Sequence, residues 1–213
     1  MSRTRIKFCG MTRREDIDTA VKLGVDAIGL IIAARSPRRL TAERAAELVE
    51  GLPPLLSKIL LCMDNDDAAV REAIDAAQPH WLQFHGSEPA ATCERFGLPY
   101  LKAVPMDSLA DDAALQAYIA GHPGAAGFVL DSHAVGAAGG SGKTFDWSRR
   151  PAVSRPWLLA GGLDPDNVAE AIRTLRPFAV DVSSGVESAP GIKDSERMRR
   201  FVSEVRRSDL ENE

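Results

Sequence analysis

The sequence lacks the long apolar runs and biased tracts that mark membrane and disordered chains. None of its apolar runs approaches the roughly 20 residues of a membrane-spanning helix, and its 213 residues contain 45% hydrophobic and 26% charged residues, the balance of a globular protein. The stretch that follows residues 1–5 is too short for the apolar part of a secretory signal. We therefore expect no membrane partner.

Cysteine is scarce as well. The three cysteines, Cys9, Cys62 and Cys93, lie far apart and form no C-x-x-C pair. An odd number at such spacing argues against a disulfide framework and against a structural zinc site. Reduced thiols are typical of cytoplasmic proteins, so we expect a cytoplasmic location.

Positive charge is not in excess. The net charge of −4 gives no electrostatic reason for the chain to bind nucleic acid. Short basic runs such as Arg38-Arg39 are more typical of solvated surface than of a partner site. No G-x-G-x-x-G follows the first apolar run, which removes the commonest dinucleotide-binding pattern.

The strongest positive signal is an alternation of strand-length apolar runs with segments of helical period. Several of the runs are apolar at successive positions, as expected for strands buried on both faces of a parallel sheet. We predict eight strands, at residues 5–9, 27–32, 58–63, 81–84, 100–104, 127–131, 157–160 and 179–183.

Helices are predicted between most of these runs. A capping box of Thr12 and Glu15 favours a helix ending near Gly24. Asp164 followed by Pro165 reads as an N-cap with proline at the first helical position. The other predicted helices cover residues 42–50, 66–77, 88–96, 109–120 and 195–207, and the sixth connection offers only a short candidate at 145–149.

Eight strands, about eight connections and no linker favour a single-domain (β/α)8 TIM barrel over residues 1–207, with 208–213 as a disordered tail. A doubly wound open sheet is the main rival, because strand–helix alternation fits both architectures.

Function in such a barrel gathers at the carboxyl ends of the strands. Cys9, ahead of a helix start, could have a lowered pKa and act as base or nucleophile, or could be a small buried hydrophobe. Arg38 offers a planar fork for a carboxylate or phosphate, or is simply an exposed side chain. His85 could be an acid or base that contacts substrate, or could hold a strand end by a hydrogen bond. Asp131, directly after an apolar run, suits a general acid at a desolvated mouth, or is a turn residue.

Three glycine-rich loops follow the sixth, seventh and eighth runs. Glycine lets backbone N–H groups approach an anion closely, and phosphate sites after strands seven and eight recur in this fold. The segment after the seventh run precedes a predicted helix start, which also favours phosphate. The candidate phosphate-binding residues are Gly140, Gly142, Gly161, Gly162, Ser184 and Gly185.

Taken together, these segments resemble the phosphoribosylanthranilate isomerase family of tryptophan biosynthesis. Each motif alone is weak, but all occur in family order over nearly the whole chain. They are Lys7–Thr12, Ser36–Arg38, Leu82–Gly86, Leu130–Ser132, Gly139–Gly142 running into Phe145–Trp147, Ala160–Leu163, Val180–Glu187 and Gly191–Asp194.

The resemblance implies an Amadori rearrangement of N-(5′-phosphoribosyl)anthranilate to 1-(2-carboxyphenylamino)-1-deoxyribulose 5-phosphate. It implies Cys9 as general base, Asp131 as general acid and Arg38 as the group that holds the anthranilate carboxylate. The glycine loops would hold the phosphate. The family needs no metal or organic cofactor, and the expected partner is a small phosphoribosyl substrate. The sequence leaves open whether the chain is a monomer or a homodimer.

Three segments depart from the usual family pattern. They are Leu30–Ala34, Leu61–Met63 and Val104-Pro105, all expected near the mouth or the pocket wall. The alternatives are therefore a paralogous aldose–ketose isomerase acting on another phosphoribosyl compound, and a non-catalytic phosphate-binding barrel.

Overall fold

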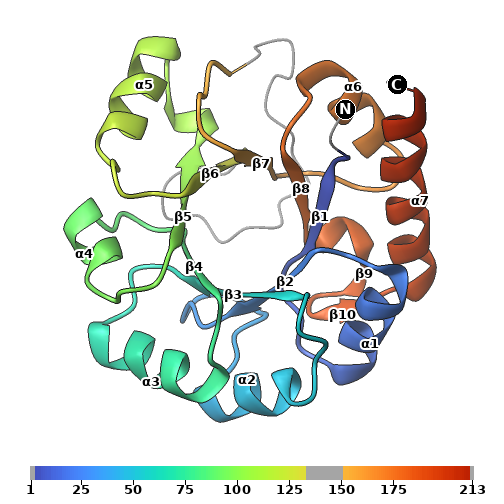
Figure 1. The fold of residues 1–213 in the computed structure, drawn as a ribbon, viewed down its shortest axis with the longest axis horizontal. Helices are drawn as coiled ribbons and strands as arrows, with labels where there is room; N and C mark the ends of the chain where they lie inside the picture. The colour runs from blue at the N-terminus through green and yellow to red at the C-terminus, as the bar shows by residue number, and fades with distance from the viewer. Residues whose placement is uncertain (1–2, 133–150, 212–213) are drawn as a thin grey trace.

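The chain folds as a closed barrel of parallel strands, as a computed structural model describes it for residues 3–132 and 151–211. Every neighbouring pair is parallel, and β8 pairs with β1 to close the ring (Figure 1). The strands are β1 (Arg5–Phe8), β2 (Ala27–Ile31), β3 (Ser57–Cys62), β4 (Trp81–Phe84), β5 (Tyr100–Pro105), β6 (Gly127–Asp131), β7 (Trp157–Leu159) and β8 (Ala179–Val182). The prediction of a (β/α)8 barrel is confirmed, and the open sheet is wrong.

Helices surround this ring (Figure 1). They are α1 (Arg14–Leu23), α2 (Ala42–Val49), α3 (Asp67–Ala77), α4 (Ala90–Glu94), α5 (Asp112–Ala120), α6 (Val168–Leu175) and α7 (Ser195–Glu211). Short 3-10 turns occur at η1 (Met106–Ser108) and η2 (Ser184–Val186), and a hairpin of β9 (Glu187–Ala189) and β10 (Ile192–Lys193) lies between β8 and α7. The helix predicted at 145–149 lies outside the described residues.

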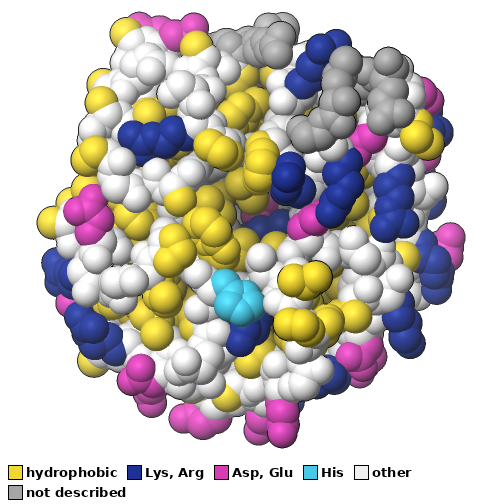
Figure 2. All heavy atoms as spheres, viewed as in Figure 1, with side chains coloured by type: hydrophobic (Ala, Val, Ile, Leu, Met, Phe, Trp, Pro, Cys, Tyr) yellow, Lys and Arg dark blue, Asp and Glu magenta, His cyan; other side chains and the backbone are white. Residues whose placement is uncertain are grey.

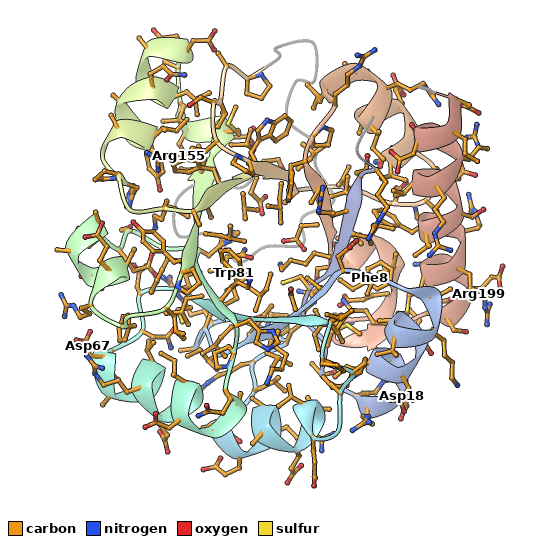
Figure 3. All side chains as sticks on the ribbon, viewed as in Figure 1. Phe8, Asp18, Asp67, Trp81, Arg155 and Arg199 are labelled. Atoms are coloured by element: carbon orange, nitrogen blue, oxygen red, sulfur yellow. The ribbon has the colours of Figure 1, made fainter. Side chains whose placement is uncertain are left out.

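The strands bury both of their faces, which explains their continuous apolar sequence. Leu101 and Ala103 of β5 belong to a cluster inside the barrel, whereas Val104 packs in the larger cluster between the barrel and the helices. Phe8 of β1 belongs to that outer layer and points toward α7, its ring 6.0 Å from that of Phe201 (Figure 3). The barrel interior is therefore a packed core, and only its two ends are available for binding.

Two predicted helix starts differ from the structure. The capping box does not form: α1 has Arg13 at its N-cap without a side-chain cap, and the Thr12 hydroxyl donates instead to the Gly191 carbonyl of the β9–β10 hairpin. The helix after β7 begins at Val168 and not at Asp164, whose carboxylate accepts hydrogen bonds within the preceding turn. A tertiary contact replaces the predicted cap at Thr12, whereas Asp164 makes its hydrogen bonds within a local turn that precedes the helix.

The predicted tail from Ser208 is wrong for residues 208–211. Helix α7 continues through Glu211, and the Ser208 side chain is fully buried. Asp209 accepts hydrogen bonds from the backbone N–H and the hydroxyl of Thr4, at 2.9 and 2.6 Å. The sequence predicted a disordered end, but this contact ties the helix to the segment before β1. In the described part of the chain, no helix is both long enough and apolar enough to cross a bilayer.

The two ends of the barrel differ in chemistry. In Figure 1 the strands follow one another clockwise, and because such crossovers are right-handed, the amino ends of the strands face the viewer. On this face hydrophobic side chains gather around a central hollow (Figure 2), which corresponds to an apolar cavity of about 220 Å³ that includes Trp81, the first residue of β4. The chemistry-bearing residues gather at the opposite end.

Candidate active site

A cavity of about 230 Å³ opens at the carboxyl ends of the strands. Its lining includes seven of the residues that the sequence singles out, which come from six different strand ends. They are Cys9, Arg38, His85, Asp131, Gly161, Gly162 and Ser184. Gly185 lies next to this lining, and Gly140 and Gly142 are outside the described residues. The barrel thus brings most of the candidate residues together although they span the chain.

Cys9 is the first residue after β1 and is 5% exposed. Its backbone N–H donates to the Val182 carbonyl at 2.9 Å, which fixes it against the end of β8. Gly29 of β2 leaves room for the thiol, since a Cβ at that position would lie 2.7 Å from the Cys9 sulfur. The thiol is therefore held between two neighbouring strands at the floor of the cavity.

The ionisation of Cys9 differs from the sequence prediction. Burial raises the pKa of the thiol, while the nearby ammonium groups of Lys7 and Lys193 lower it, and the net effect is a raised pKa. The predicted lowering by a helix start is wrong because α1 begins only at Arg14, and a helix dipole acts within about its first turn. Buried lysines, and not a helix, supply the positive charge near this sulfur.

Asp131 closes β6 and is 7% exposed. The Nε2 atom of His85 lies 3.5 Å from its Oδ2 atom, and Nδ1 of the same ring lies 3.3 Å from the side-chain nitrogen of Gln83. Gly161, with a φ of 83°, packs directly beside this carboxylate, where a Cβ would come within 2.9 Å of Oδ1. Asp131 therefore has an aromatic nitrogen on one side and a glycine loop on the other.

Arg38 is buried, so the alternative of an exposed side chain is wrong. Its Nε and Nη2 atoms donate to the two oxygens of Glu187 at 2.7 and 2.6 Å. Burial raises the pKa of Glu187, but the bonds from Arg38 and Lys193 outweigh it and leave that pKa below the usual value. The guanidinium is thus fixed in place at the cavity wall by a bidentate contact.

The two glycine loops after β7 and β8 are in direct contact. Gly161 and Gly162 have φ values of 83° and 66°, which residues other than glycine rarely adopt. A Cβ on Gly185 would overlap the carbonyl oxygen of Leu163, so the second loop packs onto the first. Because α6 starts only at Val168, the backbone of these loops, and not the first turn of that helix, borders the cavity.

If these loops bind phosphate, as the sequence predicts, Gly185→Ala is expected to separate them and to weaken the binding of inorganic phosphate by about tenfold or more. The added methyl group overlaps backbone, and a side-chain rotation cannot relieve this overlap. Competitive inhibition by phosphate measures this. Gly124→Ala is the matched control, since its methyl group would meet only the flexible Glu94 side chain away from the cavity. Equal phosphate inhibition in both variants would contradict the prediction.

The chain was compared with known protein families and with solved structures. The family model for N-(5′-phosphoribosyl)anthranilate isomerase matches residues 6–204. The chain belongs to this isomerase family. A relative of that name from Xanthomonas euvesicatoria is 53% identical over 211 residues, which cover 97% of this chain and 95% of the relative. The resemblance read from the motifs is confirmed, and so is an isomerase function in tryptophan biosynthesis.

Solved structures of the family have the same architecture. Phosphoribosylanthranilate isomerase from Thermotoga maritima superposes with a TM-score of 0.83 at 32% identity, covering 95% of this chain and 98% of that one. A family structure in complex with reduced 1-(o-carboxyphenylamino)-1-deoxyribulose 5-phosphate has a TM-score of 0.79 at 29% identity, with 95% and 98% coverage.

Two of the segments that depart from the usual family pattern form the apolar wall of the cavity. Ile31, Ala33 and Leu61 pack with Cys9 in one small cluster, and Met63 lies against it. All four border the cavity, whereas Val104 and Pro105 of the third segment do not. The departures therefore change the surface available to an apolar part of a ligand.

Sequence reasoning missed a buried ion pair below the cavity. Lys7 of β1 and Asp181 of β8 are register partners, and Nζ lies 2.6 Å from Oδ2. The available signal was a charged residue inside each of two apolar runs, because a buried charge requires a partner. The Asp181 Oδ1 and Gln83 Oε1 atoms have no hydrogen-bond partner among the described atoms, and both residues border the cavity. They are acceptors that hydroxyl groups of a ligand could satisfy.

No group of three histidine, cysteine or acidic residues in the described ranges, 3–132 and 151–211, is placed to hold a metal ion.

Proposed function

We propose that this chain converts N-(5′-phosphoribosyl)anthranilate to 1-(2-carboxyphenylamino)-1-deoxyribulose 5-phosphate with Cys9 as general base and Asp131 as general acid. The observation that carries the proposal is that a thiol and a carboxylate, from β1 and β6, border one small cavity beside two glycine loops. The family structure with the reduced product bound supports the assignment of the ligand. The three buried, unpaired cysteines fit a reducing cytoplasm.

In this mechanism the reaction begins at the ribose ring. Asp131 gives a proton to the ring oxygen, the bond from that oxygen to C1′ breaks, and the nitrogen lone pair forms an iminium ion. The Cys9 thiolate then removes the proton from C2′, and the electron pair of that C–H bond neutralises the iminium to give an enolamine. The enolamine tautomerises to the ketone product. Both groups must reach the same ribose, which a fixed orientation of the substrate favours.

The phosphate and the ribose hydroxyls supply that orientation. We assign the phosphate to the backbone N–H groups of Gly161, Gly162, Ser184 and Gly185, since such loops can surround an anion. Gly140 and Gly142 remain predicted contributors. The buried acceptors on Gln83 and Asp181 are suited to ribose hydroxyls, because each would otherwise stay unsatisfied.

The aromatic half of the substrate fits the remaining surface. The apolar wall of Ile31, Leu61 and Met63 suits a benzene ring, and Arg38 borders the same cavity with its guanidinium fixed by Glu187. We therefore assign the anthranilate carboxylate to Arg38 and count His85 among the groups that contact the substrate beside Asp131.

Arg38→Ala is expected to raise KM by about 10- to 100-fold with a smaller effect on kcat, because a charge-assisted hydrogen bond contributes about 1.5–3 kcal/mol. Steady-state kinetics with N-(5′-phosphoribosyl)anthranilate measure the change. The exposed Arg35, which also borders the cavity, gives a comparison through Arg35→Ala, for which a smaller rise is expected. An unchanged KM in Arg38→Ala would assign the carboxylate to another group.

The proposed activity is tested by expressing the chain in a tryptophan auxotroph that lacks this isomerase. Growth without tryptophan is expected, and loss of growth in a Cys9→Ala/Asp131→Asn double variant ties it to the site. Failure of a well-expressed wild-type chain, with turnover of a different phosphoribosyl compound in a direct assay, would establish the paralogous isomerase instead.

A further inference from the structure

Lys193, at the end of the β9–β10 hairpin, is buried beneath the cavity and has no assigned role. Its Nζ atom donates to the Cys9 carbonyl at 2.6 Å, the Ser183 carbonyl at 3.1 Å and Glu187 Oε1 at 2.8 Å, and the Ser183 hydroxyl lies 3.4 Å away. Three acceptors match the three donors of an ammonium group, whereas a neutral amine has only two. Burial lowers the pKa of Lys193 and the contact with Glu187 opposes this shift. The two carbonyls and the carboxylate can only accept hydrogen bonds, so this geometry favours the ammonium form, which joins the ends of β1 and β8 to Glu187.

The charges of Arg38, Glu187 and Lys193 do not cancel. Arg38 and Glu187 form a bidentate pair that is neutral as a whole, and both side chains are less than one-tenth exposed. A neutral pair attracts an added carboxylate weakly, because the attraction of the guanidinium is opposed by repulsion from the nearby carboxylate. Lys193 contacts the same carboxylate, so the three side chains together carry one uncompensated positive charge. A single carboxylate would neutralise it.

We propose that Lys193 is a positioning and specificity residue that offsets Glu187, so that Arg38 can accept the carboxylate of the substrate. The inference rests on the proposed role of Arg38 and extends it: specificity for a carboxylated aromatic amine depends on the net positive charge that these three side chains carry together. Glu187 orients the guanidinium, and Lys193 cancels the charge that this orientation introduces. The hydrogen bonds from Lys193 to the Cys9 and Ser183 carbonyls hold the general base and the phosphate loop in fixed positions relative to this cluster.

The test compares two probes that differ only in the carboxylate. One is the reduced product analogue, (2-carboxyphenylamino)-deoxyribitol 5-phosphate, and the other is the same compound without the carboxyl group. Calorimetric titration gives a Kd for each, and their ratio reports carboxylate selectivity. In Lys193→Met the selectivity is expected to fall by about tenfold or more, while the Kd of the probe that lacks the carboxyl group changes by less than about threefold. A selectivity equal to that of the wild type would overturn the proposal.

A charge-restoring double variant separates this role from a structural one. Lys193→Met leaves the cluster neutral, but adding Glu187→Gln restores one positive charge on Arg38. Selectivity is therefore expected to recover at least in part in the double variant, and to stay the same or rise in Glu187→Gln alone. A double variant with selectivity no higher than that of Lys193→Met, or lower selectivity in Glu187→Gln than in the wild type, would overturn the proposal. The Glu187→Gln measurement stands even where Lys193→Met does not fold.

Lys102→Met is the matched control for burial. Lys102 is also a buried lysine with a carboxylate partner, Glu88 at 2.8 Å, but it does not border the cavity. Lys102→Met is expected to lower Tm without changing the carboxylate selectivity, and a loss of selectivity equal to that in Lys193→Met would count against a specific role of Lys193.

The outcomes for Arg38 and Lys193 can be distinguished. If Arg38→Ala abolishes selectivity and Lys193→Met does not, only the role of Lys193 is contradicted. If the wild type shows no selectivity, the proposed role of Arg38 fails with it.

Discussion

Cys9→Ala is expected to lower kcat by about 10²- to 10⁴-fold, the range that positioned acid–base groups contribute. The thiol is the basic group that borders the cavity at the end of β1, and Gly29 of β2 leaves room for its sulfur. The substitution leaves the backbone hydrogen bond from residue 9 to the Val182 carbonyl in place, so we expect the site to retain its shape. Steady-state kinetics with N-(5′-phosphoribosyl)anthranilate, with KM followed separately, measure the effect.

The pH dependence gives a second measurement of the same role. Burial raises the pKa of Cys9 against the effect of Lys7, so at neutral pH most of the thiol in the free enzyme is protonated. A base must be deprotonated, and kcat/KM is therefore expected to rise with pH through the neutral range and to level off only on the alkaline side. Cys93→Ala, a buried cysteine away from the cavity, is the control and should keep this profile. A kcat near the wild-type value in Cys9→Ala would remove the thiol from the role of base.

The barrel was predictable from sequence because parallel strands that are buried on both faces appear as short, continuous apolar runs. The strands predicted at residues 27–32 and 127–131 are β2 (Ala27–Ile31) and β6 (Gly127–Asp131), in which every residue is buried. Helix boundaries were less predictable, because they depend on contacts between distant segments. Thr12 has the sequence of a cap but bonds to Gly191, and Asp209 has the composition of a tail but bonds to Thr4.

The candidate site was predictable to the extent that its residues lie directly after strands. Cys9, His85 and Asp131 follow apolar runs, and a barrel places all such positions at one end. The electrostatics of the site were not predictable in this way. Glu187 and Lys193 reach Arg38 and Cys9 from a hairpin far along the chain, and only the fold reveals that contact.

Asp131→Asn is expected to lower kcat by about 10²- to 10⁴-fold as well, while the affinity for the reduced product analogue changes by less than about threefold. The amide keeps the size of the carboxylate and its place between His85 and Gly161, but it cannot give the ring oxygen a proton. Opening of the ribose ring would then lack its acid, and binding would be largely preserved. Kinetics with the natural substrate and titration with the analogue measure the two effects separately.

The contrast between kcat and affinity separates an acid from a residue that only shapes the pocket. A shaping role predicts that the analogue binds more weakly in proportion to the loss of kcat, and that result would contradict the assignment of Asp131. Asp111→Asn is the matched control: Asp111 caps α5 through a 2.8 Å bond from the Ala114 N–H and does not border the cavity. Asparagine is nearly as good an N-cap as aspartate, so this variant should keep the wild-type kcat. The loss at Asp131 then belongs to the proton and not to the exchange of a carboxylate for an amide.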